Sequence, residues 1–376
     1  MQIGLYFHIP FCASKCYYCD FLSFPKQKEQ ERYMEALIQE IEKTSESLPL
    51  ETSVKSIFIG GGTPTVLPPF LLDRLMKAIV THFKLEPSCE WTIEANPGTI
   101  ERDKIEVLRK YPITRISLGL QSTHNDLLKS IGRLHRFEDW EESIRLIKAY
   151  TSWQINTDLM FALPNQSFEA FKETLETIVK YDLEHLSVYA LIIEEGTTFG
   201  DLYEEGKIKE VPEELDRKMY HYAQTYLKEQ GYTQYEISNW AKEGYECKHN
   251  LVYWQCEPYI GLGLGAHSLY DGKRFYNEEN LEKYIKAAGD LKKLRHDEEI
   301  LTPKMMMEEY IFLGLRLLSG IDEIAFEEKF GQSIWDAYPY QLNKWIKQGA
   351  LVHDKKRIYL SHYGLDVCNE IFSSFL

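Results

Sequence analysis

Three cysteines near the amino terminus are the residues whose types and spacing point most directly to chemistry. Cys12, Cys16 and Cys19 form a Cys-x3-Cys-x2-Cys pattern directly after a strand-like run at residues 4–9. Three thiolates on one short loop can ligate three irons of a cubane iron–sulfur cluster, which normally takes four protein ligands. The remaining iron is then open to a small chelating molecule. A structural zinc site is the alternative, and it needs a fourth ligand, for which His8 is the nearest candidate.

The other cysteines limit the class of protein. The 376 residues contain seven cysteines, of which Cys89, Cys247, Cys256 and Cys368 are scattered singly. This odd and uneven set is unlike the disulfide framework of a secreted protein. The first residues lack the basic and long apolar segments of a secretory signal, and no apolar run reaches the roughly 18 residues of a membrane span. We therefore expect a cytoplasmic protein.

The charge balance bears on partners. Asp and Glu outnumber Lys and Arg by 58 to 43, which gives a formal net charge of −15. Binding to nucleic acid needs a basic face that neutralises phosphates, so the sequence argues against a nucleic-acid partner.

Alternating elements in the first half predict how the cysteine loop is positioned. Six apolar strand-like runs are each followed by a helical pattern, at residues 4–9, 54–59, 91–95, 115–120, 155–163 and 186–191. The helical pattern after the fourth run is clearest over residues 137–150. This alternation predicts an α/β fold of parallel strands joined by right-handed crossovers. A full or partial β/α barrel and an open doubly wound sheet both satisfy it. Glycine and polar residues follow several strands, at the edge where such folds carry their chemistry: Gly60–Gly62, Glu94, Gln121 and Asp158.

The chain divides into three expected parts. Residues 1–230 form the β/α core, and residues 231–300 form an extension rich in aromatic residues and glycine, of which residues 231–276 are expected to be loop-rich. Residues 301–376 form a smaller, mainly helical C-terminal domain. Its short helices precede a hairpin-like segment at residues 351–361, an order compatible with a winged-helix-like domain.

A glycine run after the second strand adds to the cysteine pattern. Residues 60–65 read GGGTPT, in which Gly61 and Gly62 let backbone approach a ligand closely and Thr63 supplies a hydroxyl. Together with CxxxCxxC after the first strand, this run resembles the radical S-adenosylmethionine (SAM) superfamily. The resemblance implies a partial (β/α)6 TIM-like barrel. It also implies a [4Fe-4S] cluster held by the three cysteines, with SAM on the open iron.

Further blocks resemble the subfamily of oxygen-independent coproporphyrinogen III oxidase. They include YFHIPFCASKCYYCDF at Tyr6–Phe21, EANPGT at Glu94–Thr99, NTDLMFALP at Asn156–Pro164 and GLGAHS at Gly263–Ser268. Matching positions in that subfamily contact SAM. The resemblance therefore implies SAM-binding roles for Tyr6, Tyr18, Gly61, Gly62, Thr63, Glu94, Gln121, Arg133, Asp158, Ala190 and His267.

Two departures from the oxidase favour its heme chaperone relatives. The oxidase motif continues to a fourth cysteine, where this chain has Phe21. The oxidase also carries a long segment before the cluster, whereas eleven residues precede Cys12 here.

The segment His249–Trp254 points in the same direction. It reads HNLVYW and matches HNxxYW, which resembles the heme-binding motif of those chaperones. Imidazole is a good axial ligand for heme iron, and Tyr and Trp offer flat apolar faces. The resemblance implies that heme is bound by His249, Asn250, Tyr253 and Trp254, with Cys247 as a second candidate ligand. The alternative is that His249 is a packing residue with satisfied hydrogen bonds.

The expected function is that of a heme chaperone. By resemblance, the chain holds heme and passes it to apoproteins such as membrane respiratory enzymes, with at most transient membrane contact. Whether it also cleaves SAM as an enzyme stays open. One alternative is an oxidase that decarboxylates coproporphyrinogen through a SAM-derived radical. A structural zinc module inside an interaction protein is the other.

Overall fold

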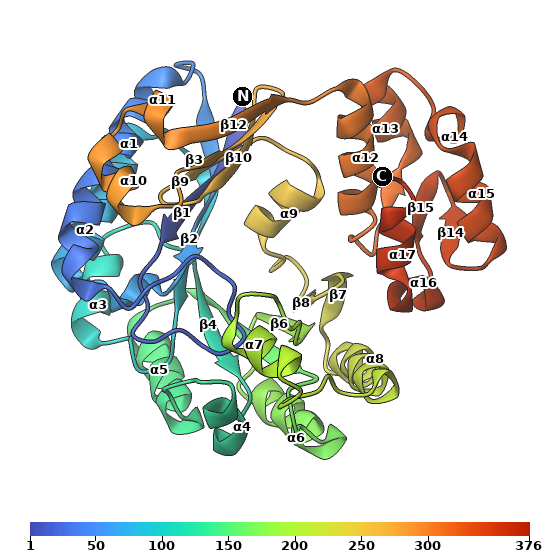
Figure 1. Ribbon diagram of the computed structural model, residues 1–376, viewed down its shortest axis with the longest axis horizontal. Helices are drawn as coiled ribbons and strands as arrows, with labels where there is room; N and C mark the ends of the chain where they lie inside the picture. The colour runs from blue at the N-terminus through green and yellow to red at the C-terminus, as the bar shows by residue number, and fades with distance from the viewer.

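A curved twelve-stranded sheet is the framework of the protein, whose computed structural model describes residues 1–376 (Figure 1). Six parallel strands lie side by side in sequence order at its centre: β1 (Gln2–Ile9), β2 (Ser53–Gly61), β3 (Leu85–Ala95), β4 (Arg115–Gln121), β5 (Gln154–Phe161) and β6 (His185–Ala190). The strand order never reverses, so the sheet has no switch point of the doubly wound kind. The predicted α/β fold is confirmed.

Both edges of the six-stranded core are extended by short strands. β9 (Tyr259–Leu262) pairs with β1 in parallel, and the antiparallel strands β10 (His267–Tyr270), β11 (Lys273–Asn277) and β12 (Arg295–Ile300) follow it. Beyond β6 lie β8 (Asn239–Ala241) and β7 (Thr233–Glu236). The edge strands β12 and β7 do not pair with each other. The barrel is therefore partial.

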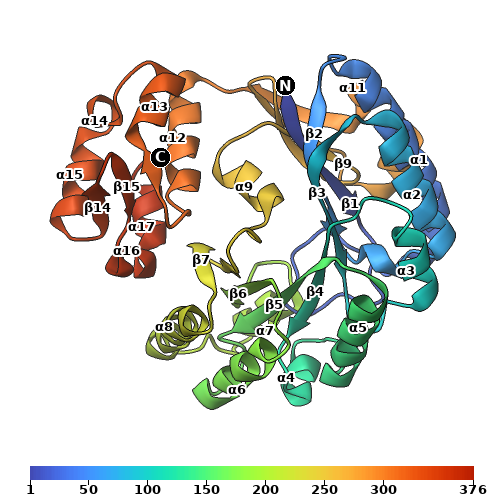
Figure 2. The ribbon, with the colours of Figure 1, turned by 180° about the vertical axis from the view of Figure 1, so that it is seen from behind.

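Amphipathic helices cover the outer face of the core strands (Figure 2). In α1, for example, Tyr33, Met34, Leu37 and Ile41 recur at helical spacing and are buried. The 137–150 helix predicted from periodicity coincides with α5. The helices of this layer are α1 (Gln30–Ser47), α2 (Pro69–His82), α3 (Arg102–Leu108), α4 (Asn125–Ser130), α5 (Phe137–Tyr150) and α6 (Phe168–Val179). After β6 come α7 (Thr198–Glu204) and α8 (Glu213–Glu229).

The prediction that residues 231–276 are loop-rich was wrong, and the whole segment at residues 231–300 contains many regular elements. The segment holds six strands, β7 to β12, and the helices α9 (Lys248–Trp254), α10 (Leu281–Ala287) and α11 (Leu291–Leu294). Each of these strands spans at most six residues, which is too few to show a clear alternation of apolar and polar side chains. One available signal was missed: Asp271 and Gly272 both take positive φ, 52° and 69°, between the paired strands β10 and β11. Asp-Gly at that position is a strong hairpin signal.

Residues 301–376 form the C-terminal unit, which lies beside the open side of the curved sheet (Figures 1 and 2). Helices precede a hairpin of β14 (Leu351–Asp354) and β15 (Arg357–Leu360), as expected, and β13 (Ile321–Asp322) adds a third strand. The helices are α12 (Pro303–Gly314), α13 (Glu323–Phe330), α14 (Ile334–Ala337), α15 (Pro339–Lys347), α16 (His362–Asp366) and α17 (Cys368–Ser373). None of the helices in the structure has both the length and the hydropathy needed to cross a membrane.

Candidate functional site

The three-cysteine loop follows β1 at the carboxyl end of the core strands. Cys12, Cys16 and Cys19 carry free thiols and all line one cavity of about 110 Å³. Backbone bonds fix the loop at two points: Cys12 N–H donates to the Phe24 carbonyl over 3.1 Å, and Tyr17 N–H donates to the Ile131 carbonyl over 3.0 Å. The loop thus presents its thiols to a single space without a disulfide.

The spacing of the thiols suits a cluster better than a single zinc ion. The three sulfurs do not all lie within 4.8 Å of one another. Zinc–sulfur bonds in a tetrahedral site would bring them to about 3.8 Å, whereas the thiolates of a cubane bind different irons. His8 is not a free fourth ligand, because its Nδ1 bonds Tyr6 Oη over 2.9 Å and its Nε2 bonds the Leu22 carbonyl over 2.8 Å.

The glycine run packs directly against the cysteine loop. A Cβ on Gly62 would lie 2.6 Å from the Phe11 carbonyl oxygen, so no larger residue fits without moving the loop. Gly61 takes a φ of 105° and donates its N–H to Glu94 Oε2 over 3.1 Å. Thr63 Oγ1 accepts from Asn96 Nδ2 over 2.7 Å and lies 3.6 Å from Cys12 Sγ. The two sequence motifs therefore form one structural unit.

Two carboxyl groups and one guanidinium face the same cavity. Burial and, to a smaller extent, the neighbouring Asp158 raise the pKa of Glu94 to about 8. Burial likewise raises the pKa of Asp158. Arg133 donates to Asn96 Oδ1 over 2.7 Å and to Tyr18 Oη over 2.9 Å, and its buried Nε has no partner. No ion pair joins Arg133 to Asp158.

The two carboxyl groups and the guanidinium complement a ligand that carries both positive and negative groups, with a net positive charge. A positive group near Glu94 and Asp158 would favour their ionised forms, which the dry cavity otherwise disfavours. The unpaired N–H of Arg133 is a donor for an anionic group such as a carboxylate. SAM carries a sulfonium, an ammonium and a carboxylate, so its charges match the groups present.

Most of the residues predicted to contact SAM or the cluster line this space. Thr63 lines a second cavity, of about 280 Å³, that shares Cys16 and Arg133 with the first. Those lining the first cavity are Cys12, Cys16, Cys19, Tyr18, Gly61, Gly62, Glu94, Gln121, Arg133 and Asp158.

Three predicted residues line neither cavity. Tyr6 lies within β1, before the strand's carboxyl end, where its hydroxyl bonds His8. Ala190 follows Tyr189 on β6, and successive side chains of a strand point to opposite faces. Tyr189 lines the first cavity, so the Ala190 side chain points away from it. His267 is exposed on β10, where its ring stacks on Tyr276 at 5.3 Å between centroids.

Asn96, Ser117 and Tyr189 also line the first cavity but were not predicted. Strand alternation was the available signal, since Ser117 shares a strand face with Gln121 four residues later. Tyr189 Oη donates to Gln121 Oε1 over 3.2 Å, which ties two strand ends together.

Helix α9, which carries the HNxxYW segment, packs against the amino-terminal halves of β1, β2 and β3. The Glu90 carboxylate of β3 accepts the N–H groups of Lys248 and His249, each over 3.1 Å, at the start of the helix. The Arg115 guanidinium of β4 donates to the Tyr245 carbonyl over 3.1 Å. The motif thus lies at the opposite end of the strands from the cysteine loop.

His249 is 1% exposed and both of its ring nitrogens are bonded. Nδ1 bonds Ser56 Oγ over 3.0 Å, and Nε2 bonds Tyr253 Oη over 2.9 Å. Burial lowers the pKa of His249 to about 3, so its ring is neutral at pH 7. In this conformation His249 is engaged within the protein.

An aromatic column connects α9 with the cysteine loop. The His249 ring stacks on Phe58 at 5.4 Å between centroids, and Phe58 stacks on Tyr6 at 6.4 Å. Tyr6 in turn bonds His8, whose ring lies 2.4 Å from where a Cβ on Gly61 would sit. A chain of packed side chains therefore links α9 to Gly61, which lines the cavity beside the cysteine loop.

The other face of α9 meets the C-terminal unit. Asn250 and Trp254, four residues apart, share this face. The Arg316 guanidinium lies 4.5 Å from the Trp254 ring. Trp254 lines a cavity of about 410 Å³ together with Tyr310, Lys329 and Arg357.

Cys247 is a weak candidate ligand. Its buried Sγ donates to Glu90 Oε1 over 3.4 Å, and burial raises the pKa of the thiol to about 12. A thiol held protonated binds metal poorly, because the thiolate is the ligand form.

Comparisons with known proteins match both parts of the chain. The model of the Radical SAM superfamily matches residues 6–178, and that of the HemN C-terminal domain matches residues 301–367. The chain is 39% identical over 372 residues to a heme chaperone HemW of Lactococcus lactis subsp. lactis (strain IL1403), covering 99% of this chain and 96% of that protein. It is 37% identical to a heme chaperone HemW of Bacillus subtilis (strain 168), covering 99% and 98%.

A solved structure shares the fold. Coproporphyrinogen III oxidase (HemN) from Escherichia coli, described as a radical SAM enzyme, superposes with a TM-score of 0.85. The match covers 100% of this chain and 90% of that one, at 23% sequence identity. At that identity the likeness establishes the architecture alone.

Proposed function

Because the chain belongs to the heme chaperone HemW family, we propose that it binds heme and passes it to apoproteins, among them respiratory enzymes. The observation that carries the proposal is the column of Tyr6, Phe58 and His249 rings, which connects the HNxxYW helix to the region of the cysteine loop. This arrangement lets the state of one site influence packing at the other. The proposed setting is the cytoplasm, with contact to membranes only during delivery.

The cysteine loop is the proposed cluster site. Cys12, Cys16 and Cys19 would hold a [4Fe-4S] cluster and leave one iron without a protein ligand. A cluster bound there, with SAM on the open iron, supplies one-electron chemistry. Phe21 lines the cavity where the oxidase pattern has a fourth cysteine, so it adds an apolar wall and no sulfur.

The residues around the loop have assignable roles toward SAM. Gly61 and Gly62 let the end of β2 pack directly against His8 and the cysteine loop, since any Cβ there would meet the His8 ring or the Phe11 carbonyl. Glu94 and Asp158 would hold cationic groups, and Arg133 Nε would hold an anionic group. Gln121, with a φ of 76°, is fixed at the end of β4 by Tyr189.

For heme, His249 is the proposed axial ligand. Its neutral imidazole is the ligand form, but Nε2 must first part from the Tyr253 hydroxyl. Tyr253 is only partly buried and ends the helix turn that begins at His249, so displacement of its ring would uncover the nitrogen. On the other face, Trp254 offers an aromatic surface, and Lys329 and Arg357 offer cations for carboxylates such as heme propionates.

A pair of assays separates the chaperone from the oxidase. After anaerobic reconstitution of the cluster, heme titration should saturate with an absorption change, as binding to a defined site requires. The same preparation with SAM, a reductant and coproporphyrinogen III should form no decarboxylated product. The E. coli oxidase provides the positive control. Turnover comparable to that control, together with absent heme binding, would reject the proposed function.

A further inference from the structure

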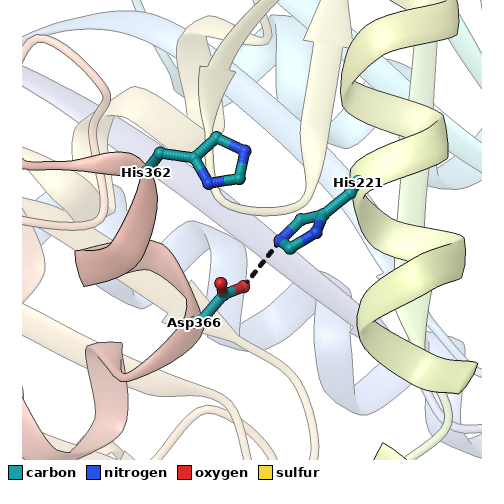
Figure 3. A group of neighbouring side chains, drawn as sticks. All are labelled: His221, His362 and Asp366. Atoms are coloured by element: carbon teal, nitrogen blue, oxygen red, sulfur yellow. Dashed lines mark hydrogen bonds and ion pairs between the residues drawn. The ribbon is translucent and has the colours of Figure 1, made fainter. Parts of the chain in front are cut away.

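Two histidines and an aspartate converge where the C-terminal unit meets α8 (Figure 3). His221 belongs to α8, whereas His362 and Asp366 are the first and last residues of α16. The potential ligand atoms of the three all lie within 4.8 Å of one another. His221 Nε2 bonds Asp366 Oδ1 over 2.9 Å, and the rings of His221 and His362 lie 4.7 Å apart between centroids.

Local sequence explains the convergence. His362 and Asp366 are four residues apart, so one turn of α16 presents both on the same face. Ser361 caps this short helix by accepting the Gly364 N–H over 2.9 Å, which fixes where the turn starts. His221 faces them from a helix of seventeen residues. Two separate parts of the chain therefore supply the cluster.

The three side chains retain free ligand capacity. Asp366 Oδ2 and both ring nitrogens of His362 make no hydrogen bond within the protein, and His362 is exposed to solvent. Arg217 lies 3.4 Å from Asp366 Oδ1, but its Nε and remaining NH2 group are bonded to Asp216. The positive charge of Arg217 is thus largely neutralised by Asp216.

We propose that His221, His362 and Asp366 bind a divalent transition-metal ion of the zinc type, clamping the C-terminal unit to the barrel. Two imidazoles and a carboxylate, completed by water, form a common four-coordinate zinc set. Tetrahedral bonds to nitrogen and oxygen place ligand atoms about 3.3 Å apart. In the present cluster no two of the potential ligand atoms are more than 4.8 Å apart, and His221 Nε2 and Asp366 Oδ1 are already at 2.9 Å. Imidazole donors also suit copper and nickel, and a carboxylate disfavours soft monovalent ions.

The site is separate from the cysteine loop in composition and position. No cysteine takes part, and none of the three residues lines the cavities beside the cluster loop. Because one ligand comes from α8 and two from α16, the metal would stabilise the contact between the units. Without a metal, the polar interactions between α8 and α16 at this point are the His221–Asp366 hydrogen bond and the Arg217–Asp366 ion pair.

The test is zinc binding to the full-length chain in two backgrounds. The first is the cluster-loaded protein, in which iron occupies the thiols. The second is the variant Cys12→Ser/Cys16→Ser/Cys19→Ser, which lacks the competing thiols. Elemental analysis after desalting should find a single zinc per chain in both. Added Zn²⁺ should also raise the midpoint of thermal unfolding, since only the folded chain assembles the site.

Single substitutions locate the ion. His221→Ala and His362→Ala should each weaken zinc binding at least tenfold and abolish the thermal shift, whereas His82→Ala, on α2, should change neither. His362 is exposed, so its variant should fold normally. Equal zinc affinity in His221→Ala and the unsubstituted chain would overturn the clamp. So would loss of all zinc binding in the triple cysteine variant, because the thiols alone would then account for it.

Discussion

Replacing Cys16 by serine should remove the iron–sulfur cluster, and SAM binding with it, while the protein stays folded. Cys16 is one of three thiols that line a single cavity, and no further cysteine lines that cavity. Two thiolates cannot hold a cubane that already lacks one protein ligand. Cys16 is only partly buried and makes no side-chain hydrogen bond in the structure, so a serine hydroxyl fits there at little cost in stability.

Iron and acid-labile sulfide, measured after anaerobic reconstitution, are the readout. Both should fall to background in Cys16→Ser, and SAM affinity should drop by more than tenfold. Cys89→Ser is the matched control, because Cys89 is a partly buried thiol that bonds only the adjacent Glu90 carbonyl. Full iron and sulfide in Cys16→Ser would refute the assignment. Zinc in place of iron in the unsubstituted chain would restore the structural zinc alternative.

Heme affinity should move in opposite directions in two variants of α9. His249→Ala removes the proposed axial ligand and should weaken heme binding at least tenfold. Tyr253→Phe removes the hydroxyl that occupies His249 Nε2. A buried hydrogen bond of this kind contributes about 1 kcal/mol, so its loss should tighten heme binding about fivefold.

Anaerobic heme titration followed by absorption measures both changes, and the shape of the bound spectrum reports the axial ligand. His185→Ala is the matched control: His185 is also buried, with Nδ1 on Asn156 Oδ1 at 2.6 Å and Nε2 on Tyr235 Oη at 2.9 Å. It should leave heme affinity unchanged. Wild-type affinity and spectrum in His249→Ala would show that His249 is a packing residue and that another group ligates the iron.

The core of the fold could be predicted because its strands and helices have strong, long-range periodicity. The six strand positions and the 137–150 helix agree with the structure to within a few residues, except that β3 starts six residues early, at Leu85. The extension could not be predicted in the same way, because its strands owe their existence to pairing with β1 and β6. Such edge strands are determined by tertiary contacts that local patterns do not carry.

The residues of the candidate site also fall into two groups: those in contiguous sequence motifs could be predicted, and those brought together only by the fold could not. Residues inside contiguous motifs, such as Cys12–Cys19 and Gly61–Gly62, were predicted to lie together and do line one cavity. Tyr189 lines the cavity but was not predicted, because strand alternation, which decides which side chains of β6 face inward, was not applied to this strand; the predicted SAM contact of Ala190 stays a prediction. The His221–His362–Asp366 cluster had no signal in the sequence, since its first two members lie 141 positions apart in the chain.

The rate of heme transfer tests the chaperone function most directly. Heme-loaded protein is mixed with an excess of an apo-form b-type respiratory hemoprotein, and absorption changes follow the exchange. Direct handover predicts a transfer rate that rises with acceptor concentration and exceeds the rate at which heme leaves the chain alone. A rate independent of acceptor concentration and equal to spontaneous release would contradict the proposed function, because the chain would then only bind heme and not deliver it.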